Sequence, residues 1–325
     1  MTNLPGLIAC VAIALIAIAL GLFVPIVGGP VFGIAIGAIV AAAMTIPQSW
    51  KPGIALASKL LLQVSIVLLG ANLSIREVAS NGARSLPVML GTLVLVLAAS
   101  YVLGKALGIE RDLRRLLGVG TAICGGSAIA AVATAIDAER ADIAYALSTV
   151  FLFNIVAVLT FPAIGHAMHL TDHAFGLWAG TAINDTSSVV AAAFSYSHAA
   201  GSEAVIVKLT RTLLIVPIVL FYAGKRIFAA RGTGALPWRE IIPWFALWFV
   251  LATALNAVGA IPAAAHAYVQ QAALFAIVVA LAGVGLSADY ARIKAAGVRP
   301  LVLGLLLWVL IAVSSLGIAR FAGVA

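Results

Sequence analysis

Charged residues are scarce in this chain. Asp, Glu, Lys and Arg make up only 9% of its 325 residues, whereas apolar residues make up 64%. Apolar runs of about 20 residues, the length that spans a bilayer as a helix, recur along the whole sequence. The composition argues against a soluble globular protein and predicts an all-α, polytopic membrane protein.

Cysteine is nearly absent as well, with only Cys10 and Cys124. Both fall in apolar segments far apart in the sequence, so neither a disulfide framework nor a thiol-rich metal site is indicated. No Lys or Arg precedes the first apolar run, and many runs follow it, which is not the pattern of a cleavable signal. We expect the first run to be retained as a helix, and we expect no cofactor and no metal.

Pro, Gly and clusters of charge divide the chain into about eleven apolar segments. We interpret them as the helices of a single membrane-embedded domain covering residues 1–325. They lie near residues 6–24, 31–46, 53–73, 86–107, 115–136, 142–164, 174–197, 203–223, 241–260, 268–287 and 300–321.

Basic residues give the expected orientation, because cytoplasmic loops retain positive charge. Twelve of the nineteen Lys and Arg lie in four alternate connections, which we expect on the cytoplasmic side, with the N-terminus inside and the C-terminus outside. No connection exceeds about 20 residues, so the net charge of +8 does not indicate a nucleic-acid-binding domain. The twelve residues are Lys51; Lys105, Arg111, Arg114 and Arg115; Lys225, Arg226, Arg231 and Arg239; and Arg292, Lys294 and Arg299.

A weak internal repeat relates the third and fourth segments to the tenth and eleventh. An odd number of segments separates each from its counterpart, so the related pairs are expected to run in opposite directions, as in transporters with inverted repeats. Chance matching of Gly, Leu and Ser in apolar sequence is the alternative. At an offset of 213 residues, Gly70, Leu73, Ser74, Pro87, Leu90, Gly91 and Leu97 match Gly283, Leu286, Ser287, Pro300, Leu303, Gly304 and Leu310.

Two segments place helix-breaking and polar residues where a membrane helix should continue: GTAICGGSA at 120–128 and GTAINDTSS at 180–188. Unwound backbone at membrane depth is tolerated only where it is buried in protein or lines a watery cavity. The breaks therefore predict a site for a polar solute, with close packing of small residues as the alternative. The residues of this candidate site are Cys124, Gly125, Gly126, Ser127, Asn184, Asp185, Thr186, Ser187 and Ser188.

The eleven-segment count makes the two interrupted segments run parallel. Either their shared GTAI sequence is accidental, or one of them is re-entrant and the count is off by one.

Four charged residues lie well inside predicted helices: Lys59, Asp185, Lys208 and Arg211. A charge at the bilayer centre costs about 2.5–3.5 kcal/mol on the insertion scale, so it normally faces the protein interior and has a partner. Lys208 and Arg211 share one helix face and join the candidate site, and an Asp185–Arg211 ion pair is sterically reasonable. A buried pair that only fixes helix register is the alternative, and Lys59, near a helix end, can extend its amine to the interface.

The amides of broken helices carry partial positive charge and can hold an oxyanion beside a guanidinium. Together with Lys208 and Arg211, they favour an anionic substrate.

Four motifs resemble those of a known family: LLGANLS at 68–74, GTAICGGSAIAA at 120–131, GTAINDTSSVVAAAF at 180–194 and KLTRTLLIVP at 208–217. Over most of its length the chain resembles the YeiH-type sulfate exporter family of bacterial inner-membrane proteins. The resemblance implies a relationship to bile-acid/sodium symporters and sodium/proton antiporters, with a panel domain, a core domain and crossed discontinuous helices. It also implies the cell inner membrane and sulfate as substrate.

Other chemistry is less well supported. His166, His169 and His173 have helical spacing and could bind a transition metal, but solvated histidines at the membrane surface are the simpler interpretation. Cys124 as an intramembrane nucleophile would need a base, and no His or suitable Asp is near it in sequence. We therefore expect no enzyme activity. A passive anion channel is a stronger rival, although Asp185 argues against an anion pore.

We predict a secondary transporter for a small anion, with export of sulfate or a related sulfur oxyanion as the leading case. Cation-coupled uptake of an organic anion is the alternative. The expected partners are the anionic substrate, the lipid bilayer, a coupling proton or sodium ion, and no nucleic acid, with a homodimer left open.

Overall fold

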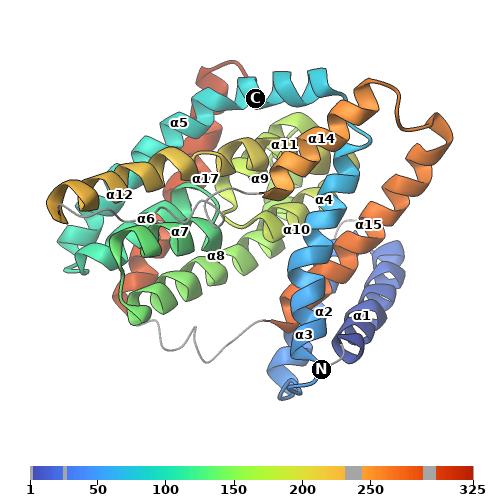
Figure 1. Ribbon diagram of the computed structural model, residues 1–325, viewed down its shortest axis with the longest axis horizontal. Helices are drawn as coiled ribbons and strands as arrows, with labels where there is room; N and C mark the ends of the chain where they lie inside the picture. The colour runs from blue at the N-terminus through green and yellow to red at the C-terminus, as the bar shows by residue number, and fades with distance from the viewer. Residues whose placement is uncertain (1–2, 25–27, 231–243, 288–297, 325) are drawn as a thin grey trace.

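The computed structural model describes residues 3–24, 28–230, 244–287 and 298–324 (Figure 1). These residues form helices and short connections, without strands. Seven of the helices are long and apolar enough to cross a membrane. The all-α polytopic membrane class is confirmed. Of the basic residues used to predict orientation, Arg231, Arg239, Arg292 and Lys294 lie outside the described ranges.

The helices follow the apolar segments closely, and the third segment contains a π-helical stretch, η1. Their bounds are α1 Leu4–Phe23, α2 Gly28–Ala43, α3 Lys51–Ala55, η1 Leu56–Leu61, α4 Leu62–Gly70, α5 Ile75–Ala106, α6 Arg111–Ala122, α7 Gly126–Ile136, α8 Arg140–Ala167, α9 Asp172–Ala182, α10 Thr186–Tyr196, α11 His198–Thr212, α12 Ile215–Ala230, α14 Trp244–Ala257, α15 Ala263–Leu286 and α17 Val298–Phe321.

The helices form two groups that pack side by side. The first group, on the right of Figure 1, contains α1 to α4, α14 and α15. Small residues let its backbones touch: a Cβ atom at Gly285 would lie 2.3 Å from the carbonyl oxygen of Ile34, and one at Gly37 would lie 2.5 Å from that of Ala282. In lipid the hydrophobic effect does not drive helices together, so close van der Waals packing of this kind holds them in contact.

The second group contains α5 to α12 and α17 and surrounds one large apolar core. Aromatic rings fix its α8, α9 and α17: Phe161 stacks on Trp178 with ring centroids 4.1 Å apart, and Phe153 stacks on Trp308 at 5.7 Å. The two groups meet through a further apolar cluster that includes Ile34 of α2, Val190 of α10 and Ile206 of α11. Two groups of helices agree with the panel and core that the family resemblance implies.

The second interrupted segment doubles back on itself. The ring of Tyr196, at the end of α10, stacks on Phe175, in the first turn of α9, with centroids 3.9 Å apart. Ser197 Oγ donates to Asp172 Oδ1 at 2.7 Å, and Tyr196 Oη donates to the carbonyl of Leu170. The helices α9 and α10 therefore form a re-entrant hairpin that enters and leaves at the same end of the protein.

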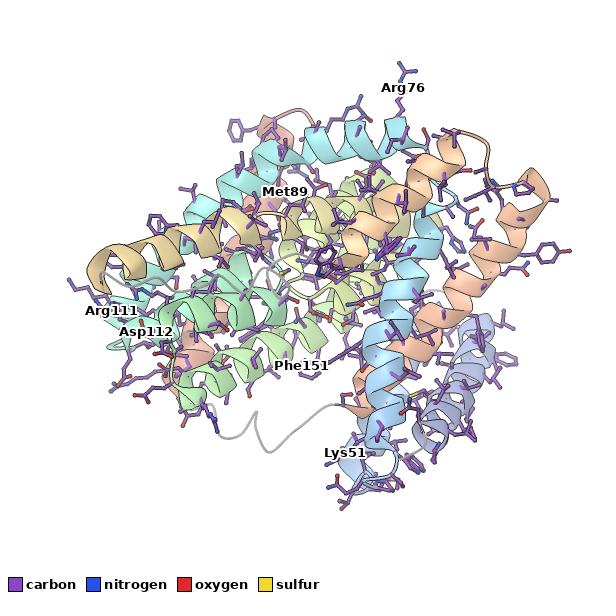
Figure 2. All side chains as sticks on the ribbon, in the orientation of Figure 1. Lys51, Arg76, Met89, Arg111, Asp112 and Phe151 are labelled. Atoms are coloured by element: carbon purple, nitrogen blue, oxygen red, sulfur yellow. The ribbon has the colours of Figure 1, made fainter. Side chains whose placement is uncertain are left out.

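The first interrupted segment also doubles back. Glu110 and Asp112, at the start of α6, lie within electrostatic reach of Asp142, in the first turn of α8, directly after α7. A Cβ atom at Gly120 of α6 would lie 2.7 Å from Ile129 of α7. Figure 2 shows Arg111 and Asp112 at the end of the molecule where α8 begins. The helices α6 and α7 thus form a second hairpin, which enters from the opposite end of α8.

The two hairpins explain why the eleven-segment count made the interrupted segments run parallel. Both segments are re-entrant, where the sequence suggested at most one, and they enter from opposite ends. At 1.5 Å per residue, half-helices of eleven and twelve residues are about 16–18 Å long, roughly half a bilayer. Hydropathy cannot distinguish such a hairpin from a broken span, because both of its arms are apolar.

The predicted inversion of the repeat agrees with the packing. A Cβ atom at Gly91 of α5 would lie 3.0 Å from Ile318 of α17, and one at Gly104 would lie 3.2 Å from Leu303, so α5 and α17 run antiparallel. The helices α4 and α15 also run in opposite directions in Figure 1.

Candidate functional site

The tips of the two hairpins touch at the centre of the second group. The tip of the first hairpin is Ile123 to Gly125, and that of the second is Ile183 to Asp185. A Cβ atom at Gly125 would lie 3.5 Å from the backbone nitrogen of Asp185. Gly125 also has a φ of 66°, a conformation that other residues rarely adopt. Glycine at this position therefore permits the turn between the two half-helices.

Lys208 connects the two tips. Its side chain is fully buried, and Nζ donates to the carbonyl oxygens of Ile123 and Ile183, each at 2.9 Å. These carbonyls lie just beyond the C-terminal ends of α6 and α9, where helical carbonyls lack partners within the helix. One side chain of α11 therefore caps both half-helices.

Arg211 caps the same end of α6 from one turn further along α11. It is fully buried, Nε donates to the carbonyl of Ala122 at 2.8 Å, and Nη2 donates to that of Thr121 at 3.3 Å. The predicted ion pair between Asp185 and Arg211 is wrong: among the described residues, Arg211 is bound to backbone carbonyls instead. The unpaired carbonyl end of α6 attracts the guanidinium because it carries partial negative charge.

Asp185 instead caps the N-terminus of α10. Its carboxylate accepts the backbone N–H of Ser187 at 3.0 Å and also the Ser187 hydroxyl. Asp185 is half-buried, as is the neighbouring Thr186, whereas Ser187 and Ser188 are buried. A carboxylate at a helix N-terminus is stabilised by the amide dipoles.

Asn154 of α8 belongs to the site and was missed by sequence analysis. Its Oδ1 accepts the backbone N–H groups of Asn184 at 3.2 Å and Asp185 at 3.3 Å, so it holds the tip of the second hairpin. The available signal was a lone amide side chain in the middle of an apolar segment, a position where polar groups have a partner or a function.

The N-terminal ends of α7 and α10 differ in exposure. In the first hairpin, Gly126 is half-buried and Ser127 is exposed, while Cys124 is buried. In the second hairpin, Asn184 is only 1% exposed. The structure thus brings all of the predicted site residues to the two tips, to the helix starts that follow them and to α11, and the start of α7 is more exposed than the start of α10.

Several buried polar atoms around the tips have no hydrogen-bond partner among the described residues. Such atoms are rare in proteins and point to a bound polar species or to water. They are Thr149 Oγ1, Thr181 Oγ1, Asn184 Oδ1 and Arg211 Nη1.

The remaining candidates lie elsewhere. Lys59 is exposed in η1, in agreement with an amine that extends to the interface. The three histidines are separated: His166 stacks on Tyr196, His169 is exposed, and His173 Nδ1 lies 3.3 Å from Glu203 Oε1. No group of three potential metal ligands occurs in the part of the chain that the structure describes.

Glu203 is a second residue that sequence analysis missed. It is 6% exposed, accepts a hydrogen bond from Asn81 Nδ2 and lines a pocket of about 480 Å³ at the base of the second hairpin. His173, Asp172 and Glu77 also line this pocket. It lies at the end of α11 away from the tips, so it is separate from the candidate site.

The part of the chain that matches known proteins includes both hairpins and α11. A model of the family described as Conserved hypothetical protein 698 matches residues 5–304. UPF0324 membrane protein FN0533 of Fusobacterium nucleatum is 38% identical over an alignment of 342 positions, which covers 99% of this chain and 99% of that protein. UPF0324 membrane protein SAG1125 of Streptococcus agalactiae is 38% identical over an alignment of 329 positions, which covers 99% of this chain and 98% of that protein. The chain belongs to the UPF0324 family of membrane proteins.

Membership of the UPF0324 family agrees with the resemblance to the YeiH-type proteins. The names of these relatives place them in a membrane and state no substrate. The chemistry of the site therefore has to be argued from its geometry.

Proposed function

We propose that this UPF0324 protein is a secondary transporter for a small anion. The observation that carries the proposal is the meeting of two re-entrant hairpins, from opposite ends of the protein, at two buried cations. Broken helices that meet at mid-membrane are the usual sites of secondary transporters. The geometry supports a substrate held by the N-terminal amides of α7 and α10.

The charges around the tips favour an anion. Lys208 and Arg211 contribute two positive charges and Asp185 one negative charge. The C-terminal ends of α6 and α9 contribute about −0.5 each, and the N-terminal ends of α7 and α10 about +0.5 each. The sum is about one positive charge, which an anionic group can neutralise. Arg211 Nη1, buried and without a hydrogen-bond partner, is a suitable donor to it.

The proposed location is the cell inner membrane, with a cytoplasmic N-terminus and a periplasmic C-terminus. Because both interrupted segments are re-entrant, the number of spans falls by two, and the four basic connections stay on one side. Arg140, at the start of α8, joins that side as well. The first hairpin then enters from the cytoplasm and the second from the periplasm.

Export of sulfate or a related sulfur oxyanion is the leading case. Moving a divalent anion outward across an inside-negative membrane releases about 4.6 kcal/mol per 100 mV, so export needs no coupling ion. Cation-coupled uptake of an organic anion is the second candidate, favoured by the acid Asp185 near the tips. A passive channel would have to tolerate that same acid beside its anion. Enzyme activity is not part of the proposal.

The test is a binding screen of the purified protein in detergent. Sulfate, sulfite, thiosulfate and small carboxylates are titrated with sodium or choline as the cation, at two pH values. Saturable binding of an oxyanion supports the proposal, and absence of binding by every anion contradicts it. A sodium requirement for carboxylate binding would favour the uptake alternative.

A further inference from the structure

The environment of Lys208 resembles a cation site made by the protein backbone. Its two acceptors, the carbonyl oxygens of Ile123 and Ile183, come one from each hairpin. In transporters with discontinuous helices, unwound backbone carbonyls and the C-terminal ends of half-helices are the groups that coordinate a coupling sodium ion. Here those same groups bind an ammonium that belongs to the chain.

The charge of the Lys208 ammonium also matches the partial charges of the two helix ends. The C-terminal ends of α6 and α9 together carry about one negative charge. One ammonium group neutralises it, so a second cation at the same carbonyls would be repelled by Lys208 and by Arg211, which binds the neighbouring carbonyl of Ala122.

Among the described residues, the carboxylate of Asp185 lies within electrostatic reach of Lys208, but it makes no hydrogen bond to the ammonium. The carboxylate of Asp185 is engaged by the N–H and hydroxyl groups of Ser187, at the opposite, N-terminal side of the tip. The buried acid of α11, Glu203, lies at the far end of that helix, beside His173.

We propose that the ammonium of Lys208 permanently occupies the place of a coupling sodium ion, so that the protein neither binds nor requires sodium. The coupling role rests on the proposed transport function, whereas the occupancy of the site does not. Because Lys208 is covalently attached, it also keeps the two tips joined in the absence of any dissolved cation.

The proposal is tested by the effect of sodium on thermal stability. The melting temperature of the wild type in detergent should be the same in sodium, potassium and choline chloride at equal ionic strength. In Lys208→Ala, the two carbonyls lose their cation, and sodium should enter. If the new site binds sodium with a dissociation constant near 10 mM, about 100 mM sodium raises the folded-to-unfolded ratio about tenfold.

Lys59→Ala is the matched control, since it removes an exposed lysine from another membrane helix. Its melting temperature should respond to the three salts like that of the wild type. A folded Lys208→Ala without a sodium-specific rise would overturn the proposal. So would a sodium-specific rise in the wild type.

A direct measurement covers the case in which Lys208→Ala does not fold. Equilibrium binding of radioactive sodium to the wild type should show no saturable component, and saturable binding would refute the proposal. Both readouts are independent of substrate. If the anion screen fails while these results hold, the proposed transport function fails and the assignment of the Lys208 site stands.

Discussion

Lys208 and Arg211, three residues apart on α11, donate to consecutive backbone carbonyls at the end of α6, those of Ile123 and Ala122. The two side chains therefore act on one half-helix, but only Lys208 reaches the second hairpin as well. This division separates their expected functions: Lys208 joins the tips, and Arg211 retains a donor, Nη1, without a hydrogen-bond partner.

The first prediction concerns Arg211. Arg211→Gln should abolish anion binding and leave a folded protein, because the amide can still donate to one carbonyl while the charge is lost. Binding is measured by titration of the purified variant, and folding by its melting temperature. Arg76→Gln, at an exposed position on α5, is the control. Unchanged affinity in Arg211→Gln would remove Arg211 from the substrate site.

The second prediction concerns Cys124. It is 2% exposed and lies at the contact between the tips, so it can react only when the residues that cover it move away. A membrane-impermeant thiol reagent should label it from one side of the membrane, and substrate should protect it. Cys10, which is fully buried in α1, should stay unreactive. Equal labelling of both cysteines, or no labelling of Cys124 under any condition, argues against an alternating-access cavity.

The third prediction concerns Asp185. Asp185→Asn should keep anion exchange in proteoliposomes but lose its dependence on a pH gradient, because the amide cannot ionise. The amide oxygen can still accept the N–H of Ser187, so the N-cap of α10 should remain. If wild-type exchange is independent of pH gradients, Asp185 is only a helix cap, and voltage-driven export is favoured.

The fourth prediction concerns Asn154. Asn154→Ala leaves the N–H groups of Asn184 and Asp185 without their acceptor, at a cost of about 1–3 kcal/mol for each buried group. The melting temperature should fall. Asn154→Asp should recover much of the loss, because a carboxylate oxygen can accept both bonds. Thr160→Ala is the control, since that hydroxyl bonds only within α8. Equal stability of Asn154→Ala and the wild type would contradict the role of Asn154.

The fifth prediction tests the re-entrant hairpins. Single cysteines replace Glu139 and His169, both exposed, in a background without Cys10 and Cys124. An impermeant reagent added outside the cell should label position 169 and not position 139. If both interrupted segments crossed the membrane completely, the pattern would be reversed, so one experiment distinguishes the two topologies.

Sequence alone was sufficient for the class of fold, and it identified most of the residues that the structure brings together at the hairpin tips. The GTAI breaks, Lys208 and Arg211 were recognisable because polar groups are costly in lipid and therefore usually have a partner or a function. The direction of the chain after each break was not recognisable, because it depends on the φ and ψ angles of a few residues such as Gly125. The partner of Arg211 was also missed: a sequence displays side-chain charges but not the partial charge at the end of a half-helix.

The unequal exposure of Ser127 and Ser187 has a consequence for the proposed transport cycle. Gly120 to Ile123 and Gly180 to Ile183 have the same sequence, 60 residues apart, and Ser127 and Ser187 are equivalent at that offset. In this structure Ser127 is exposed and Ser187 is buried. The two hairpins thus share a sequence motif but differ in the exposure of the serine at the start of the second half-helix. In the proposed transport cycle, an exchange of these exposures would expose Ser187 and cover Ser127, so the opposite-facing state would mirror the asymmetry of this one.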